Sequence, residues 1–398
     1  MQKLLLGGVL MAALIALWMP AAPAGATGEP APIVSDYKLL DPITHGDLTI
    51  FPVVSAKTHD TNGFLTLDEG IRSGEVVVTE AGNLHSAMQR RPAPQNYRGS
   101  AQVNSLVLVN NSQRPLILLA GEIVTGGKQD RVVAKDRIVP SESDPVDLGV
   151  FCVEPHRWVE TSNKFDTHAS VMAQPSVRKK AMAEKDQQQV WAEVNNAKTN
   201  MTAKVMAAAP AATASPGAGT GIGGGVGSGS GGGGGAGGGP QYALRIRELD
   251  ATSSYAKARE NAAVQKQVEA ITEPMQKSYE SLIKQLRNQN AVGVVVAVRG
   301  RIVWADLFAS TALLDKYWPK LLQSYAAEAL TTTGDHREVS AKEAQQFLDD
   351  WRANHETVDS EPGLYRQREL VGDRFRAFEL TSLLPKAAFD VHLSKMAD

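Results

Sequence analysis

Residues 105–120 read SLVLVNNSQRPLILLA, in which two short apolar runs flank a polar turn. Residues 105–109 and 116–120 are rich in branched apolar side chains, and Asn110-Asn111 and Arg114-Pro115 supply turn signals between them. Runs of this length and composition, bounded by turn residues, are typical of β-strands. No helix fits between the two runs, and such closely spaced strands predict an antiparallel sheet system rather than β-α-β units.

Similar strand patterns occur on both sides of this stretch, at residues 48–51, 75–79, 131–134 and 148–153. Near the end of the chain, two more pairs of apolar runs flank short turns and predict hairpins. The first pair is 292–298 with 302–304, across Arg299-Gly300-Arg301, and the second is 364–371 with 375–380, across Gly372-Asp373. The chain is therefore predicted to be an α+β protein with an antiparallel, β-rich body.

The middle of the chain has a helical pattern instead. Between residues 177 and 209 the apolar side chains recur every three or four positions, which predicts an amphipathic helix. A second helix is predicted at residues 254–270. A third is predicted from Thr272-Glu273-Pro274 to about residue 288, because a capping residue is followed there by proline in the first turn.

Two helices are predicted in the last third of the chain. Ser310 is expected to cap a helix over residues 311–330, which Pro319 should kink. Ser340 and Glu343 have the spacing of a capping box, which predicts a helix continuing to residue 350.

Residues 210–240 consist mostly of glycine, alanine and serine, which bury too little surface to offset the entropy of ordering. A disordered, low-complexity linker is predicted there. Because helices flank it and strands lie outside the helices, residues 177–290 are predicted to be a helical insertion between an N-terminal β-rich half, 27–176, and a C-terminal α+β half, 291–398. A plain linker between independent domains is the alternative.

The first 26 residues have the pattern of a signal peptide. Lys3 precedes an apolar run of about 15 residues, and Ala24-Gly25-Ala26 forms an A-x-A cleavage site. The run is shorter than the ~20 residues that a spanning helix needs, and no later segment is apolar for long enough. We expect cleavage after Ala26, no membrane span in the mature chain, and a periplasmic or secreted location; an uncleaved anchor is the alternative.

The composition of the chain argues against several classes of partner and site. The 41 basic and 43 acidic side chains nearly balance, which argues against a nucleic-acid partner. The single cysteine, Cys152, excludes an intrachain disulfide and a cysteine-based zinc cluster. The eight histidines form no H-x-x-x-H or H-x-H pair, so no metal site and no cofactor are predicted.

The densest polar cluster is GEIVTGGKQDR, residues 121–131. Its adjacent glycines permit backbone conformations closed to other residues, or a close approach to a ligand. The cluster differs from a phosphate-binding P-loop, because Glu122 stands at the first glycine position and Gln129 replaces the serine or threonine. That type of nucleotide hydrolysis is therefore excluded. The structural alternative is a tight turn in which Glu122 pairs with Lys128 or Arg131.

A second cluster is CVEPHRW, residues 152–158. Cys152 lies in an apolar strand without an adjacent basic residue, which favours an inert buried thiol. Trp158 would either stack on a planar ligand or cap the core. Taken together, the two clusters predict one ligand-binding surface formed by Glu122, Gly126, Gly127, Lys128, Gln129, Arg131, Glu154 and Arg157.

Several of these segments also carry a family resemblance. Residues 126–131 (GGKQDR), 152–154 (CVE), 157–158 (RW), 301–308 (RIVWADLF) and 318–322 (WPKLL) are similar to the bacterial ARG and rhodanese-phosphatase-superfamily-associated protein domain. The resemblance covers most of the chain outside the signal peptide and the glycine-rich stretch. The family name points to genomic association with ADP-ribosylglycohydrolases, and the resemblance itself implies no particular reaction.

Two functions remain. The first is an exported binding or interaction module for an anionic or polar ligand, with a protein partner at the helical arm. The alternative is a hydrolase acting on an anionic, ADP-ribose-like substrate, with Glu122 or Glu154 as general acid/base and Lys128 or Arg131 stabilising charge. Binding is favoured because the sequence contains no activated nucleophile, paired carboxylates or metal set.

Overall fold

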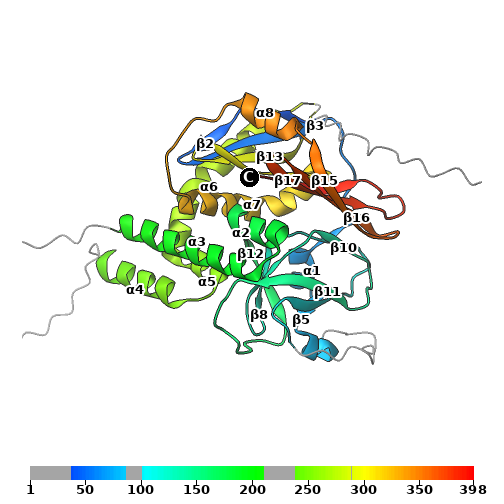
Figure 1. Cartoon of the computed structure of the whole chain (residues 1–398), viewed down its shortest axis with the longest axis horizontal. Helices are drawn as coiled ribbons and strands as arrows, with labels where there is room; N and C mark the ends of the chain where they lie inside the picture. The colour runs from blue at the N-terminus through cyan, green and yellow to red at the C-terminus, as the bar shows by residue number, and fades with distance from the viewer. Residues whose placement is uncertain (1–36, 87–100, 210–237, 288) are drawn as a thin grey trace, which may run out of the picture. The chain divides into compact units, whose positions relative to one another are not determined.

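The described part of the chain is built from three β-sheets and the helices packed on them (Figure 1). The computed structural model describes residues 37–86, 101–209, 238–287 and 289–398, all within one compact unit. The predicted signal peptide lies outside the described residues, as do residues 210–237 of the predicted disordered stretch. The predicted α+β class with an antiparallel, β-rich body is confirmed.

The largest sheet has nine strands, drawn from both ends of the chain. Its order is β1-β3-β13-β14-β18-β17-β16-β15, with β2 also pairing with β3. The strands are β1 (Lys38–Leu39), β2 (Ile43–His45), β3 (Leu48–Ser55), β13 (Asn290–Val298), β14 (Arg301–Phe308), β15 (Ala353–Glu361), β16 (Tyr365–Gly372), β17 (Phe375–Ser382) and β18 (Asp390–Ala397). Early and late segments meet where β3 pairs with β13, from Leu48 opposite Val298 to Ser55 opposite Asn290.

A six-stranded sheet and a three-stranded sheet come from the first half of the chain. The larger one is ordered β12 (Phe165–Met172), β8 (Glu122–Gly126), β9 (Arg131–Val133), β11 (Val146–Cys152), β6 (Ser105–Asn110) and β5 (Val76–Thr79). The smaller one is ordered β10 (Arg137–Val139), β7 (Leu116–Leu118) and β4 (Leu65–Thr66). Among the strand pairs described, β4 and β7 alone run parallel. One apolar cluster packs between these two sheets.

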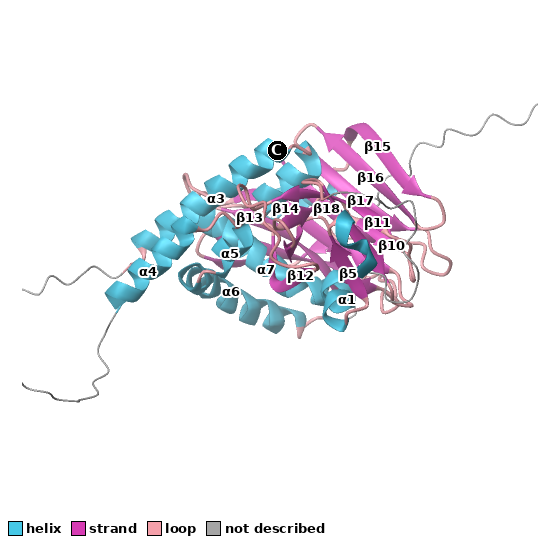
Figure 2. Ribbon diagram, turned by 90° about the horizontal axis from the view of Figure 1, so that it is seen from below, coloured by secondary structure: helices cyan, strands magenta, loops and turns pink. Residues whose placement is uncertain are grey.

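The helices connect the sheets and cover them. They are α1 (Leu67–Ser73), the 3₁₀ helix η1 (Ala81–Ser86), α2 (Pro175–Lys179), the π-helix η2 (Lys180–Glu184), α3 (Gln187–Ala207), α4 (Gly238–Ala251), α5 (Tyr255–Glu260), α6 (Ala262–Ile283), α7 (Thr311–Thr331) and α8 (Ala341–Asp349). Helices α3 to α6 gather on one side of the strands (Figure 2). Helix α7 packs on β12 of one sheet and β13 of the other, so it forms the centre of the main core.

Local signals in the sequence located several of these elements correctly. The hairpin β13–β14 turns at Arg299 and Gly300, both with positive φ, and β16 pairs with β17 as predicted. Ser310 caps α7 by accepting a hydrogen bond from the backbone N–H of Leu313. The capping box of Ser340 and Glu343 opens α8. Helix caps and tight turns depend on neighbouring residues only, which is why the sequence predicts them well.

The boundary predicted between the helices at 254–270 and 272–288 was wrong, because the break falls at Asn261 instead. The helix predicted to begin at Thr272 is the second half of α6, which starts at Ala262 and includes Pro274 in its interior. Its true cap is Asn261, whose side chain accepts a hydrogen bond from the N–H of Ala263. Proline favours a first helical turn but is tolerated within a helix that tertiary packing stabilises, and here packing decides.

The predicted helix over 177–209 is interrupted. The chain forms α2 and the π-turn η2, then Lys185 adopts a left-handed conformation with φ of 52°. Asp186 starts α3 anew, because its carboxylate accepts hydrogen bonds from the N–H groups of Gln188 and Gln189. Residues 238–240, at the end of the predicted disordered stretch, belong instead to α4, with Pro240 near its start.

Candidate functional site

The turn from β8 to β9 requires both of its glycines. Gly126 and Gly127 have φ of 122° and 47°, and a Cβ atom at Gly127 would lie 2.3 Å from the ring of Phe165. The N–H of Gly126 donates to Asp130 Oδ1 at 3.1 Å, and that of Gly127 donates to Ser162 Oγ at 3.1 Å. Both N–H groups, which we expected an anionic ligand to use, therefore bind protein oxygens.

Arg157 holds this turn in place. One terminal nitrogen donates to the carbonyl oxygens of Gly127 and Val159 at 2.9 Å each, and the other donates to that of Gly126 at 3.2 Å. The second nitrogen also pairs with Glu154 at 2.5 Å and with Asp130 at 3.3 Å. The planar guanidinium thus joins two loops through carbonyls and carboxylates together, which is the geometry of a structural clamp.

Asp130, Gln129 and Glu154 complete this buried network. The backbone N–H of Asp130 donates to Glu154 Oε2 at 3.0 Å, and the amide of Gln129 donates to the carbonyl oxygen of Glu154 at 3.2 Å. Asp130 also accepts a hydrogen bond of 2.5 Å from Ser254, the residue that caps α5. Burial, with a further contribution from Glu154, raises the pKa of the Asp130 carboxyl. The turn is therefore tied to the helical segment as well as to the neighbouring loop.

Arg131 and Lys128 lie against the ring of Trp158. Arg131 is fully buried, and its Nε and one terminal nitrogen have no hydrogen-bond partner among the described residues. Its guanidinium carbon lies 6.0 Å from the Trp158 ring centroid, and Lys128 Nζ lies 5.1 Å from it. Trp158 is 44% exposed and Lys128 is half-buried. Within the predicted surface, Lys128 and Arg157 are therefore the partly accessible side chains, and the exposed ring beside them is that of Trp158.

The register of the sheet corrects one expectation about Cys152. Arg131 lies directly opposite Cys152 in the ladder of β9 and β11, so the thiol does have a basic neighbour. Burial nevertheless outweighs it and raises the pKa of the Cys152 thiol. The thiol is buried, as predicted. A buried thiol with a raised pKa is a poor nucleophile.

Glu122 faces a different set of side chains. It accepts a hydrogen bond of 2.8 Å from the N–H of Leu119 and pairs with Lys320 of α7. Lys320 also pairs with Asp68 of α1 at 2.8 Å. Burial raises the pKa of the Glu122 carboxyl, against the effect of Lys320. The alternative in which Glu122 pairs with Lys128 or Arg131 was therefore wrong.

A fully buried charge network, which the sequence did not reveal, joins the two large sheets. Arg178 of α2 makes a bidentate contact with Asp306 of β14, at 2.9 and 3.1 Å. His392 of β18 lies between Asp306 and Asp136, with its Nδ1 2.6 Å from Asp136 Oδ2. Asp136 in turn accepts from the N–H of Ala120 at 2.7 Å. Every member is closed to solvent, so the network acts on stability rather than on a ligand.

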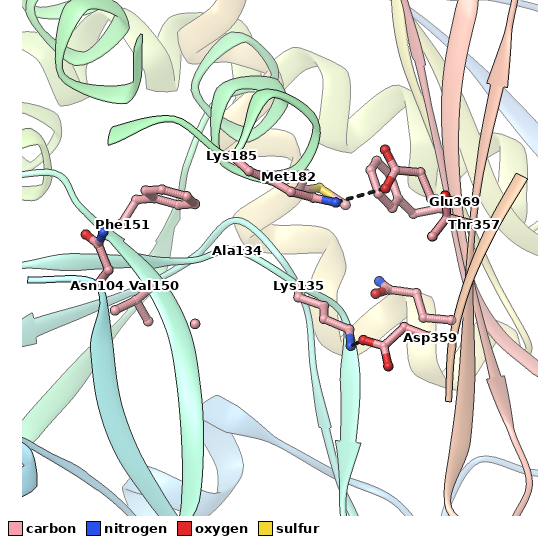
Figure 3. A pocket seen from close by; sticks show the side chains of 13 residues that line it. Asn104, Ala134, Lys135, Val150, Phe151, Met182, Lys185, Thr357, Asp359 and Glu369 are labelled. Carbon is pink, nitrogen blue, oxygen red and sulfur yellow. Dashed lines mark hydrogen bonds and ion pairs between the residues drawn. The ribbon is translucent and has the colours of Figure 1, made fainter. Parts of the chain in front are cut away.

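An open cleft of about 480 Å³ lies between the two large sheets (Figure 3). Val150 and Phe151 of β11 line one wall, and Phe378 of β17 lines the other. Met182 of the π-turn η2 also contributes to the lining. The cleft is therefore built from segments that are far apart in the sequence. None of the eight residues of the predicted ligand-binding surface is among its lining residues.

Ion pairs cross this cleft from wall to wall. Lys135, which follows β9, pairs with Asp359 of β15, and Lys185, at the end of η2, pairs with Glu369 of β16 at 2.9 Å (Figure 3). Beside the cleft, Arg137 of β10 and Glu361 of β15 form a third pair at 3.7 Å. In all three pairs the cation comes from one wall and the carboxylate comes from the β15–β16 hairpin.

A second cavity, of about 750 Å³, lies beside α8 and the end of β18. Lys395 lines it, with Nζ between 4.1 and 4.7 Å from the ring centroids of Phe347, Trp351 and Phe375. Burial lowers the pKa of the Lys395 amine to about 8. The amine donates to the carbonyl oxygens of Phe347 and Asp350, so it caps the C-terminal end of α8. Because the Lys395 amine has these protein partners, its burial is explained without a bound ligand.

The described segments contain neither a cluster of metal ligands nor a helix suited to span a membrane. No group of three or more His, Cys, Asp or Glu side chains there is arranged to hold a metal ion. Within the same segments, no helix has the length and apolar content to cross a membrane.

Comparison with known proteins identifies a family. No curated protein and no solved structure matched the chain. A family model does match it, over residues 36–396: the ARG and Rhodanese-Phosphatase-superfamily-associated Protein domain, ARPP-1. The match spans nearly the whole chain and agrees with the resemblance found in the GGKQDR and RIVWADLF segments. The chain therefore belongs to the ARPP-1 domain family.

Proposed function

We propose that this protein is an exported ligand-binding module that holds a small molecule in the cleft between β11 and the β15–β17 wall. The observation that carries the proposal is the cleft itself, which has a volume of about 480 Å³ and is lined by apolar side chains together with Lys135, Lys185, Asp359 and Glu369. Clefts of ~300–1,000 Å³ with mostly apolar walls and a few polar groups are the usual form of small-molecule sites.

The apolar lining indicates what drives binding. Val150, Phe151, Met182 and Phe378 line the cleft and belong to the core on their other sides, so their positions are fixed by packing. Covering apolar surface is favourable by ~25 cal/mol per Å². Phe151, at 9% exposed, is the most accessible of these four side chains, so an apolar ligand body would lie mainly against its ring.

Binding is favoured over hydrolysis by the position of the two candidate acid/base residues. The side chains of Glu122 and Glu154 are 2% and 3% exposed, and each is held by a cation and a backbone N–H. A general acid or base has to come within hydrogen-bond reach of the substrate proton. Neither carboxylate is accessible to a substrate, whereas the cleft is open to solvent.

Export is the second part of the proposal. It rests on the signal-peptide pattern of residues 1–26, in which a short apolar run ends at an A-x-A site. Its test concerns the N-terminus of the mature chain and is independent of the cleft.

A cleft-filling substitution tests the binding function. Gly149 lines the cleft, and a Cβ atom there meets no heavy atom within 4 Å, so Gly149→Leu should occupy the space without disturbing the fold. The probe is N-phenyl-1-naphthylamine, a neutral dye whose emission rises in apolar surroundings. We expect the wild-type protein to bind it and Gly149→Leu to bind it at least tenfold more weakly.

Gly63→Leu is the matched control. Gly63 also has open space around its Cβ position, and it lies in an exposed turn outside the cleft lining. This variant should bind the dye like the wild type. Equal dye binding by all three proteins, or no binding by the wild type, would show that the cleft is not a ligand site.

A further inference from the structure

Building on the proposed binding function, we propose that the cleft selects a zwitterionic ligand, whose carboxylate pairs with Lys135 and whose ammonium group pairs with Asp359. The inference follows from the way charge is divided between the two walls. It names the class of ligand, a small molecule with an apolar body that carries both charges.

The two walls differ in the sign of their charges. Lys135 and Lys185 both belong to the wall formed by the six-stranded sheet and η2, whereas Asp359 and Glu369 both belong to the β15–β16 hairpin. The two lysines point across the cleft to the two carboxylates (Figure 3). A ligand between the walls therefore has a positive surface on one side and a negative surface on the other.

This arrangement discriminates between kinds of ligand by their charge. A ligand with only a carboxylate would bind Lys135 by displacing Asp359, which then loses its cation. A ligand with only an ammonium group would bind Asp359 and leave Lys135 without an anion. Each case removes one ion pair for every pair it forms, so a singly charged ligand gains no ion pair in the exchange. A zwitterion replaces one pair by two, so no charge is left unpaired.

The Lys135–Asp359 pair is the easier of the two to open. The side chain of Asp359 is 64% exposed, and Lys135 is the only cation paired with it among the described residues. Glu369 is 18% exposed and has Arg376 at 3.9 Å as a second cation besides Lys185. Because exposed ion pairs contribute little to stability, Lys135 and Asp359 can separate at small cost and accept the two ends of a ligand.

Three probes with the same phenyl body test the inference by displacing N-phenyl-1-naphthylamine from the wild-type protein. They are L-phenylalanine, a zwitterion; phenethylamine, a cation; and 3-phenylpropionate, an anion. We expect L-phenylalanine to displace the dye at concentrations about threefold lower than either of the others, as one additional exposed ion pair provides. If a singly charged probe competes as well as L-phenylalanine, or if none of the three displaces the dye, the inference is wrong.

Matched variants test which carboxylate makes the protein prefer the zwitterionic probe. Asp359→Asn should remove the advantage of L-phenylalanine over 3-phenylpropionate, because the ammonium group loses its partner. Glu361→Gln is the control, since Glu361 is on the same strand and also pairs across the walls but does not line the cleft. It should keep the threefold advantage. Loss of the advantage in both variants, or in neither, would overturn the assignment.

The charge-swapped double variant Lys135→Asp with Asp359→Lys gives a third readout. A zwitterion can turn end for end, so the double variant should again prefer L-phenylalanine to both singly charged probes. A swapped protein without that preference would contradict the proposed pairing. Failure of the wild type to bind the dye at all would instead refute the proposed function on which the inference rests.

Discussion

His392 and Asp136 are 256 positions apart in the sequence, yet His392 Nδ1 lies 2.6 Å from Asp136 Oδ2 in the closed interior. The other ring nitrogen of His392 is 3.2 Å from Asp306. Burial opposes protonation of the ring, but the two carboxylates outweigh it and raise the pKa of His392 from 6.5 to about 9. An imidazolium between two carboxylates therefore links β18 to β14 and to the segment that follows β9.

The raised pKa of His392 makes stability depend on pH in a predictable direction. The folded-state pKa is higher than the unfolded one, so the stabilisation is complete below pH 6.5 and is lost as pH rises through about 9. At roughly 1.4 kcal/mol per pKa unit, the loss is on the order of 3 kcal/mol. Urea unfolding at a series of pH values between 6 and 10 measures it.

Direct titration is the control for this prediction, because Lys395 acts in the opposite direction. Its pKa is lowered to about 8 from 10.5, so its contribution to stability rises with pH between those values. The ring resonances of His392 in NMR spectra should titrate with a midpoint near 9. A midpoint near 6.5 would show that the two carboxylates do not hold the proton.

Arg157→Lys should destabilise the protein by roughly 2 to 3 kcal/mol. Lysine keeps the charge but cannot reach the carbonyls of Gly126 and Gly127 and the carboxylates of Asp130 and Glu154 together. Denaturant unfolding gives the difference in free energy. Arg352→Lys is the matched control, since that side chain is 93% exposed and its replacement should change stability by less than about 0.5 kcal/mol. Equal values for the two variants would contradict the clamp role of Arg157.

Lys128→Ala separates a binding role of the turn from a structural one. The backbone N–H of Lys128 donates to Glu80 at 3.1 Å, and this bond survives the substitution. We therefore expect the free energy of unfolding to fall by less than about 1 kcal/mol. If the turn binds anions, affinity for pyrophosphate should fall in the same variant. Unfolding of the variant, or an unchanged pyrophosphate affinity, would refute the anion-binding hypothesis for Lys128.

Gly127→Ala should cost at least about 2 kcal/mol, because a left-handed backbone and a collision with Phe165 act together. Gly46→Ala is the comparison, since Gly46 has a similar φ of 58° and nothing within 4 Å of its Cβ position. It should lose only about 1 kcal/mol from backbone strain. Thermal unfolding of both variants measures the contribution of the collision, and no difference between them would show that Phe165 moves aside.

Residues 1–26 should be absent from the exported protein, which should begin at Thr27. The expectation follows from the A-x-A site at Ala24-Gly25-Ala26. N-terminal sequencing of material recovered outside the cytoplasm checks it. Recovery of a chain that still begins at Met1 would support the uncleaved anchor.

The sequence predicted the elements that depend on neighbouring residues. Ser310 and Ser340 cap helices through their own side chains, and Gly300 turns a hairpin whose strands are adjacent in the chain. The start of α6 was misplaced because Thr272 and Pro274 resemble a helix start, while the decisive hydrogen bond belongs to Asn261. Packing against distant segments decides whether a proline begins a helix or lies within one. The residues next to the proline in the sequence do not indicate that packing.

The candidate site depends on contacts between distant segments. Residues 126–131 and 152–157 were expected to act together, and the contacts of Arg157 with Gly126 and Gly127 show that they do meet. Those contacts hold the turn because the carbonyl groups of Gly126 and Gly127 point toward Arg157. The direction of a backbone carbonyl cannot be predicted from the pattern of side chains in the sequence. The cleft needs Lys135 and Asp359 on facing walls, and their positions depend on how two sheets pack.

The pairing of β3 with β13 has a consequence for the newly made chain. All eight residues of β3 are buried in the folded protein, and the strand that covers one edge of β3 ends at Val298. Until that residue has been synthesised, at ~5–20 residues per second, Phe51, Val53 and Val54 have no β13 to pair with. Closing so long a loop is slow, and unpaired apolar strands aggregate. The emerging polypeptide therefore exposes an unpaired apolar strand during the interval between the synthesis of β3 and that of β13.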